Sequence, residues 1–187
     1  MRKIKSKIAA AALIAILLTL FTYSTIAYFS TSGVATNVVT SGNISFRVHE
    51  STYNNDPFPE EGVVILPGDV VKKEVTVENV CDHPFYLRVK LDYSVNDTRL
   101  TADDCFALDI NTAAWEYHDG WYYYKNIVKP NKTTPELFSH VEIVGDKVDN
   151  SYIGKTLTLN VVAQAVQSEH NPLTDGHTYT ALGWPAE

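Results

Sequence analysis

Charge is missing from the N-terminal part of this chain. Four Lys and Arg side chains occupy positions 2–7, but no Asp, Glu, Lys or Arg occurs from Ile8 to Phe46. Within that stretch, Ile8–Phe21 is almost wholly apolar. A basic cluster followed by an apolar run is typical of an export signal. The chain is therefore predicted to act outside the cytoplasm.

The end of the apolar run predicts where the signal is removed. Thr25 and Ala27 are small residues at the spacing that signal peptidases recognise, three residues and one residue before a cut. The predicted cut lies after Ala27 and leaves Tyr28 first, so that residues 1–27 form a helical signal peptide. The alternative is an uncleaved anchor, because Ile8–Tyr28 has roughly the 20 residues that span a bilayer. Membrane contact is expected only before cleavage.

Basic residues are in the minority, with 15 Lys and Arg against 22 Asp and Glu and a net charge of −7. Removal of residues 1–27 takes away four basic residues and no acidic ones, which lowers the net charge to −11. A chain this acidic repels phosphates, so nucleic acid is not an expected partner. The length that remains suits one domain. We expect an extended segment over residues 28–45 and a domain over residues 46–187.

Cysteine is scarce, and Cys81 and Cys105 are the only two. An even number of cysteines in an exported chain predicts a disulfide. Two buried free thiols are the alternative, because spacing alone does not show that the two Cα atoms can approach each other. A zinc site that adds His83 to the thiolates is chemically reasonable but less favoured. No metal and no cofactor is expected.

No amphipathic helix follows the export signal, whereas alternation with a period of two recurs. The clearest strand is Phe85–Tyr93, in which alternate apolar residues are predicted to face a core, while Arg88 and its alternate neighbours face water. Residues 73–79 and 155–165 alternate in the same way, and Asp119-Gly120 predicts a hairpin. Short strands separated by turns predict an all-β fold, a two-sheet jelly-roll-like β-sandwich.

Aromatic residues gather in the predicted hairpin. Alternation places Tyr122 and Tyr124 on one face of its second strand, where they could form an exposed ladder that binds glycan or a neighbouring subunit. The alternative, which we favour, is cross-strand packing inside a small sandwich.

Catalytic motifs are missing as well. Zinc proteases commonly carry two His four residues apart with an intervening Glu on a helix. Here His49-Glu50 is followed by Tyr53 at the position of the second ligand. No Gly-x-Ser-x-Gly turn marks a serine nucleophile. No catalytic residue is predicted, and the protein is not expected to be an enzyme.

Four stretches carry a family resemblance through their order along the chain. They are Ile26–Phe29 with Val34–Phe46, Leu66–Asp69 before a strand ending at Glu78-Asn79, Trp121–Tyr124 with Lys129-Pro130, and Ala163–Gln167 with Trp184. In this order they resemble the TasA and camelysin family of secreted Gram-positive proteins, which are processed by a dedicated SipW-type signal peptidase. The resemblance implies an exported jelly-roll sandwich that assembles into biofilm-matrix fibres or stays on the cell surface.

In TasA-like fibres the N-terminal segment of one subunit completes a sheet in the next, which is donor-strand complementation. This chain has an alternating run without proline or charge that suits strand addition, and its predicted assembly residues are Val34, Thr36, Val38, Val39 and Thr40. The alternative is that the run is the first strand of its own domain.

The predicted function is a secreted structural subunit of extracellular fibres. Its expected partners are further copies of itself or related subunits, together with signal peptidase during export. A monomeric cell-surface binding module is the alternative, and a metal-dependent protease of the camelysin type is a more distant one.

Overall fold

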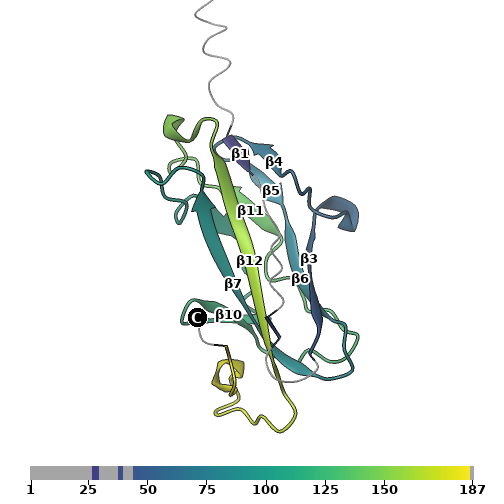
Figure 1. Ribbon diagram of the computed structural model, residues 1–187. Helices are drawn as coiled ribbons and strands as arrows, with labels where there is room; N and C mark the ends of the chain where they lie inside the picture. Colours follow the sequence, from purple (N-terminus) through teal and green to yellow (C-terminus); the bar gives the residue numbers. More distant parts are fainter. Residues whose placement is uncertain (1–26, 30–37, 40–43, 186–187) are drawn as a thin grey trace, which may run out of the picture.

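The regular secondary structure of the protein is almost entirely β-strand, as a computed structural model that describes residues 27–29, 38–39 and 44–185 shows (Figure 1). The helical elements in these ranges are three short 3-10 turns, η1 (Tyr53–Asn55), η2 (Asn150–Tyr152) and η3 (Thr178–Thr180). The strands are β1 (Ala27–Phe29), β2 (Val38–Val39), β3 (Phe46–Ser51), β4 (Val63–Ile65), β5 (Val70–Lys72), β6 (Glu74–Asn79), β7 (Phe85–Val95), β8 (Phe106–Leu108), β9 (Trp115–His118), β10 (Trp121–Tyr124), β11 (His140–Ile143) and β12 (Thr156–Gln167). The predicted all-β fold is confirmed, and the predicted signal helix lies outside the described residues.

The largest sheet has the strand order β4-β1-β12-β7-β10-β9, and β2 also pairs with β12. Its centre is the antiparallel pair β7 and β12, which stays in register from Phe85 opposite Gln167 to Val95 opposite Leu157. Figure 1 shows these two long strands running along the length of the molecule. Both strands alternate apolar and polar residues, and a slip by one residue would turn away from the core every side chain that now faces it. The apolar pattern therefore specifies this register.

The opposite layer combines the two smaller sheets, β3-β6 and β5-β11-β8. Only Lys73 separates β5 from β6, and the chain before β11 runs beside β6. The backbone N–H of Val75 donates to the Phe138 carbonyl, and that of Leu137 donates to the Val75 carbonyl. These bonds join the two small sheets into one layer.

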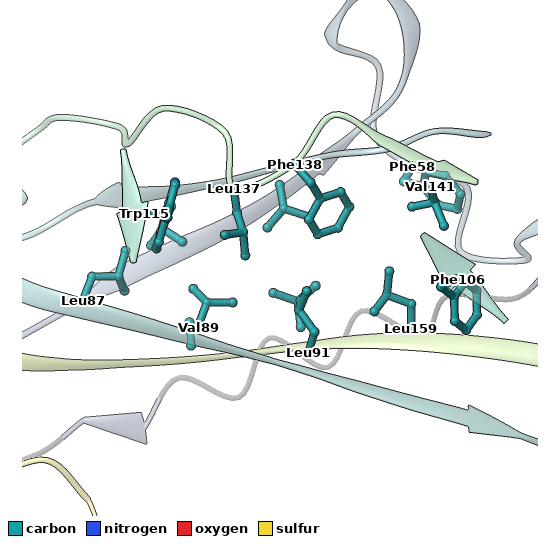
Figure 2. Close-up of a cluster of buried hydrophobic side chains, with 14 of the residues drawn as sticks. Phe58, Leu87, Val89, Leu91, Phe106, Trp115, Leu137, Phe138, Val141 and Leu159 are labelled. Carbon is teal, nitrogen blue, oxygen red and sulfur yellow. The ribbon is translucent and has the colours of Figure 1, made fainter. Parts of the chain in front are cut away.

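The hydrophobic core lies between the two layers (Figure 2). Leu157 and Leu159 of β12 are fully buried, and so are the alternate residues at the start of β7. Figure 2 shows Leu87, Val89, Leu91 and Leu159 on one side and Trp115, Leu137, Phe138 and Val141 on the other. The strands predicted over residues 73–79, 85–93 and 155–165 are confirmed.

The outer face of β7 is not in water along its whole length, so that part of the prediction for Phe85–Tyr93 is wrong. Tyr86 and Arg88 on this face are only 5% and 7% exposed, whereas Asp92 is exposed. The cause is the chain after β12: residues 168–185 fold back over this end of the sheet, and Ala181 packs against Tyr86. Figure 1 shows this C-terminal segment in yellow, beyond the end of β12.

The predicted hairpin is formed by β9 and β10, with Trp121 opposite His118. Asp119 and Gly120 have φ angles of 45° and 82°. Left-handed backbone at both central residues matches the right-handed twist of the flanking strands, and Asp-Gly adopts it readily.

The charged pair Lys73 and Glu50 is buried at the point where β5 ends and β6 begins. Lys73 is 0% exposed, and its Nζ lies 3.2 Å from Glu50 Oε1 and 4.8 Å from the centre of the Phe58 ring. Burial lowers the pKa of Lys73, and the nearby Glu50 carboxylate opposes this shift. The pair joins β3 to the boundary between β5 and β6.

Candidate functional site

The candidate assembly site is the edge of β12 that faces away from β7. At one end of this edge Thr156 and Leu157 pair with β1, and further along Gln164 and Ala165 pair with β2. Both pairings are parallel, whereas every other strand pair of the described residues is antiparallel. Parallel neighbours need a long connection. Here the connection is nearly the whole described chain, because β1 is the first and β12 the last of the described strands.

β1 lies inside the sheet, between β4 and β12. Tyr28 is opposite Thr156 on one side and Val64 on the other. Among the described strands β4 has only β1 as a partner. β1 therefore holds β4 on the sheet, and its withdrawal would open a slot with one edge on β4 and one on β12. Figure 1 shows β1, β4 and the start of β12 together at one end of the molecule.

The two pairings on β12 do not share one register. The chain has eight residues between Phe29 and Val38, whereas β12 has six between their partners Leu157 and Gln164. β1 and β2 are thus held as two separate short pairings, offset by two residues. Each short pairing contributes few main-chain hydrogen bonds compared with the long β7–β12 ladder.

The predicted assembly and cleavage residues are placed in part. Val38 and Val39 form β2, and Ala27 and Tyr28 belong to β1. The predicted residues Thr25, Val34, Thr36 and Thr40 lie outside the described residues. Sequence reasoning placed Tyr28 and Phe29 in the extended N-terminal segment but assigned Ala27 to the signal peptide, and it did not predict β4 as a partner of that segment.

In this single chain β1 and β2 pair with the sheet of their own domain. This is the arrangement expected if the N-terminal run is a strand of its own domain. The same pairings can form between two chains, because a terminal strand is joined to its domain on one side only.

The surface next to the slot is apolar. Val64 of β4 and Val70 of β5 are 57% and 58% exposed, and Tyr53 is 66% exposed. Together with Phe58 and Pro59 these side chains line a groove of about 280 Å³. Exposed apolar residues on the outer edges of two sheets favour contact with another chain.

The exposed ladder of Tyr122 and Tyr124, the less favoured of the two interpretations, does not form. Both side chains are half-buried and pack against the main core, and the Tyr124 ring lies 5.4 Å from that of Trp115 between centroids. The other face of β10 carries Trp121 and Tyr123, which are 3% and 4% exposed. Tyr179 and Trp184 of the C-terminal segment pack on Tyr123, and Arg88 lies over the ring of Trp121. Both faces of β10 are used for packing, as the favoured alternative states.

Arg88 lies at the centre of the face that the C-terminal segment covers. Its guanidinium carbon is 4.0 Å from the ring centre of Trp121 and 4.9 Å from that of Trp184. The faces of indole rings attract cations. The hydrogen-bond acceptors of Arg88 are Gln164 Oε1 at 2.9 and 2.6 Å, Tyr123 Oη at 3.1 Å and the Pro185 carbonyl at 2.8 Å. Arg88 thus fastens the C-terminal segment to the sheet, which the sequence did not reveal.

Histidine side chains add to this fastening. His177 Nδ1 lies 3.0 Å from Glu116 Oε2 of β9, and the His118 ring stacks on Tyr179 with centroids 4.0 Å apart. Both contacts join the C-terminal segment to the hairpin.

The two cysteines are free thiols, so the predicted disulfide does not form; Cys105 is buried, as the alternative states, whereas Cys81 is only half-buried. Their neighbours differ. Cys81 Sγ lies 3.1 Å from Asn79 Oδ1, whereas Cys105 Sγ donates to the Thr101 carbonyl at 3.3 Å. Burial raises the pKa of the Cys105 thiol, which makes it a poor nucleophile.

Metal ligands are not gathered in the described ranges, where no group of three His, Cys, Asp or Glu side chains could hold an ion. His49 lies on β3, with Nε2 2.9 Å from Glu78 Oε2. Its position on a strand departs further from the helical zinc-protease motif.

Ser139, His140 and Asp109 do come together at the start of β11. Ser139 Oγ lies 2.5 Å from Asp109 Oδ2 and 2.8 Å from His140 Nδ1. The hydroxyl donates directly to the carboxylate, whereas a catalytic serine gives its proton to histidine. Burial alone would raise the pKa of Asp109, but hydrogen bonds from Ser139 and His140 outweigh it and lower that pKa to about 2. The cluster fastens the loop before β11.

The helices of the described residues are too short and too polar to cross a membrane. Comparison of the chain with known protein families, with curated proteins and with solved structures finds no match. The case for a function therefore depends on the sequence motifs and on the strand arrangement around β12.

Proposed function

We propose that this protein is a secreted, non-enzymatic structural subunit of extracellular biofilm-matrix or cell-surface fibres, and that it assembles by exchanging its N-terminal segment between subunits. One observation carries the proposal: the first strand of the chain lies in the interior of the main sheet, between β4 and β12. The two layers would be arranged as a jelly roll, as in the family that the sequence resembles.

Exchange is physically favourable at this position. A strand supplied by a neighbour would restore the same main-chain hydrogen bonds to β4 and β12, so that the closed and the exchanged forms differ little in contacts. A subunit that donates its segment forward and accepts one from behind makes a head-to-tail contact. Such contacts produce a filament when the rotation between subunits does not close a ring.

The short length of β1 and β2 supports exchange as well. β1 has three residues and β2 has two, in two registers on β12. Few hydrogen bonds must break together when the segment leaves its own sheet. The long β7–β12 pair forms between two other strands.

Export of the chain is consistent with a role in extracellular fibres. The basic cluster, the apolar run and the small residues Thr25 and Ala27 predict a signal peptide, and the strongly acidic remainder suits an extracellular matrix. The apolar groove beside β4 would lie at the junction between subunits. The partners are further copies of the chain or related fibre subunits.

The test compares two purified chains, one starting at Tyr28 and one starting at Gly42. We expect filaments from the first as concentration rises, seen by light scattering and electron microscopy. The second should remain a folded monomer by circular dichroism and should bind a synthetic peptide of residues 28–41. Filaments that form equally well without residues 28–41 would contradict the proposal.

Two proline variants give a matched control. Neighbouring residues of a strand turn their N–H groups to opposite edges. Only one of Val38→Pro and Val39→Pro can therefore remove a hydrogen bond to β12, and that variant should assemble less well than the other.

A monomeric cell-surface binding module is the second candidate. The observation that favours it is the pairing of β1 and β2 within their own chain, together with the exposed groove at Tyr53, Val64 and Val70. A chain starting at Tyr28 that stays monomeric at high concentration would favour this candidate.

A further inference from the structure

The predicted cleavage bond, between Ala27 and Tyr28, lies inside β1. Ala27 is opposite Ile65, and Tyr28 is opposite both Val64 and Thr156. A peptidase holds its substrate extended and binds the backbone through the substrate's free N–H and C=O groups. A residue paired on both sides has these groups engaged within the sheet. The bond cannot enter a peptidase while β1 is docked.

We infer that export cleavage and the docking of β1 compete for the same residues, so that the bond is cut only before β12 joins the sheet. This inference rests on the proposed function, because it assumes export and removal of residues 1–27. It adds a regulatory step: the relative rates of cleavage and folding decide whether a subunit is released or stays tethered.

The order of the strands along the chain sets how long the peptidase can reach the bond between Ala27 and Tyr28. Among the described strands, β4 follows β1 after β2 and β3, whereas β12 comes last. One wall of the slot is therefore missing until almost the whole chain has crossed the membrane. Pairing of strands from opposite ends of a chain is slow, because a large loop must close first. This delay leaves the bond accessible to the peptidase.

The two outcomes differ in their capacity to assemble. Cleavage removes Ala27 from β1 and with it the pair with Ile65, which leaves Tyr28 and Phe29 to hold the strand against β4. The shortened strand leaves the slot more readily and can be exchanged. A chain that docks β1 before cleavage keeps its apolar N-terminus attached, and its slot is filled by its own strand. Such a chain stays at the membrane and cannot accept a strand from a neighbour.

The test uses the full chain in detergent, with β1 fixed by an engineered disulfide. Phe29 and Val63 are opposite each other on β1 and β4. Opposed residues of antiparallel strands have Cα atoms about 4.5–5.5 Å apart, a separation that a disulfide can bridge. The variant carries Phe29→Cys and Val63→Cys, with Cys81→Ser and Cys105→Ala to remove the native thiols. Its reduced form is the matched control.

Cleavage by a purified Gram-positive signal peptidase is followed by mass spectrometry. A synthetic peptide of residues 15–35 should be cut after Ala27. The folded, reduced chain should be cut about tenfold more slowly than the peptide or slower still, because only its transiently open form is a substrate. The oxidised chain should be slower again.

The inference is wrong if the folded, reduced chain is cut as fast as the peptide, or if oxidation leaves its rate unchanged. A peptide that is not cut after Ala27 would overturn both this inference and the export part of the proposed function. Filament formation by the chain that starts at Tyr28 tests assembly independently of these rates.

Discussion

Replacing Arg88 by methionine should loosen the C-terminal segment and destabilise the protein. Methionine keeps the apolar stem of the side chain but removes the guanidinium that lies between Trp121 and Trp184. It also leaves Gln164, which is 7% exposed, without the two N–H groups that its Oε1 accepts. The change therefore acts on the sheet and on the segment that covers it.

The magnitude follows from the contacts that are lost. A buried acceptor left without a partner costs about 1–3 kcal/mol, and each partly buried cation–π contact contributes about 0.5–2 kcal/mol. Removal of a buried charge offsets part of this loss, since the cation no longer has to leave water. We expect a net decrease of about 2–4 kcal/mol in the free energy of unfolding. Arg88→Lys keeps the charge but not the planar donor fork, so its loss should be smaller.

Urea unfolding followed by tryptophan fluorescence measures this change. Hydrogen exchange provides the local readout, because the Leu182 N–H donates to Asn171 Oδ1 within the C-terminal segment. Arg88→Met should raise exchange at Leu182 more than at amides of the β7–β12 pair. A variant that unfolds within about 0.5 kcal/mol of the parent, with unchanged exchange at Leu182, would refute the role assigned to Arg88.

Three further predictions concern buried or hydrogen-bonded titrating groups. Lys73→Met should lower the free energy of unfolding, measured in urea, by about 3–5 kcal/mol, because Glu50 is left buried without its cation. The double variant Lys73→Met with Glu50→Leu should recover most of that loss. Equal losses in the single and the double variant would contradict this prediction. Burial raises the pKa of Tyr93 to about 12, and the nearby Tyr122, Tyr117 and Asp103 add to this shift. The stability that the neutral Tyr93 side chain contributes is therefore present below pH 10 and is lost as pH rises towards 12. Tyr93→Phe should flatten the fall in melting temperature at alkaline pH. The pKa of Asp109 is lowered to about 2, so the stability that the Asp109 carboxylate contributes is present above pH 4 and is lost as pH falls towards 2. The Asp109→Asn variant should melt at a lower temperature than the parent near neutral pH, and it should lose less stability on acidification.

The strands and the hairpin could be predicted from the sequence because their signals are local. Phe85–Tyr93 alternates strictly, and Asp119-Gly120 has the backbone preference of the turn that it forms. Strand pairing is not local. Nothing near Ala27–Phe29 indicates that its partners are β4 and β12, and three residues are too few to show the period of a strand.

The prediction for Arg88 failed for a related reason. Alternation correctly separates the two faces of β7, but it does not show what covers the second face. That cover comes from residues 168–185, which have no periodic pattern and pack through Ala181 and Trp184. For the same reason the sequence left an exposed ladder of Tyr122 and Tyr124 open beside the favoured interpretation, cross-strand packing. Once the C-terminal segment covers Trp121 and Tyr123, neither face of β10 is left open.

The most direct test of strand exchange is to identify which chain supplies β1 in the assembled protein. A chain starting at Tyr28 would carry Phe29→Cys and Val63→Cys, with Cys81→Ser and Cys105→Ala, and would be oxidised after assembly. In an exchanged fibre each new disulfide joins neighbouring subunits, because Phe29 of one chain is opposite Val63 of the next. We predict a ladder of covalent multimers on a non-reducing gel. Assembled protein that yields only cross-linked monomers would show that β1 stays in its own sheet and would contradict the account.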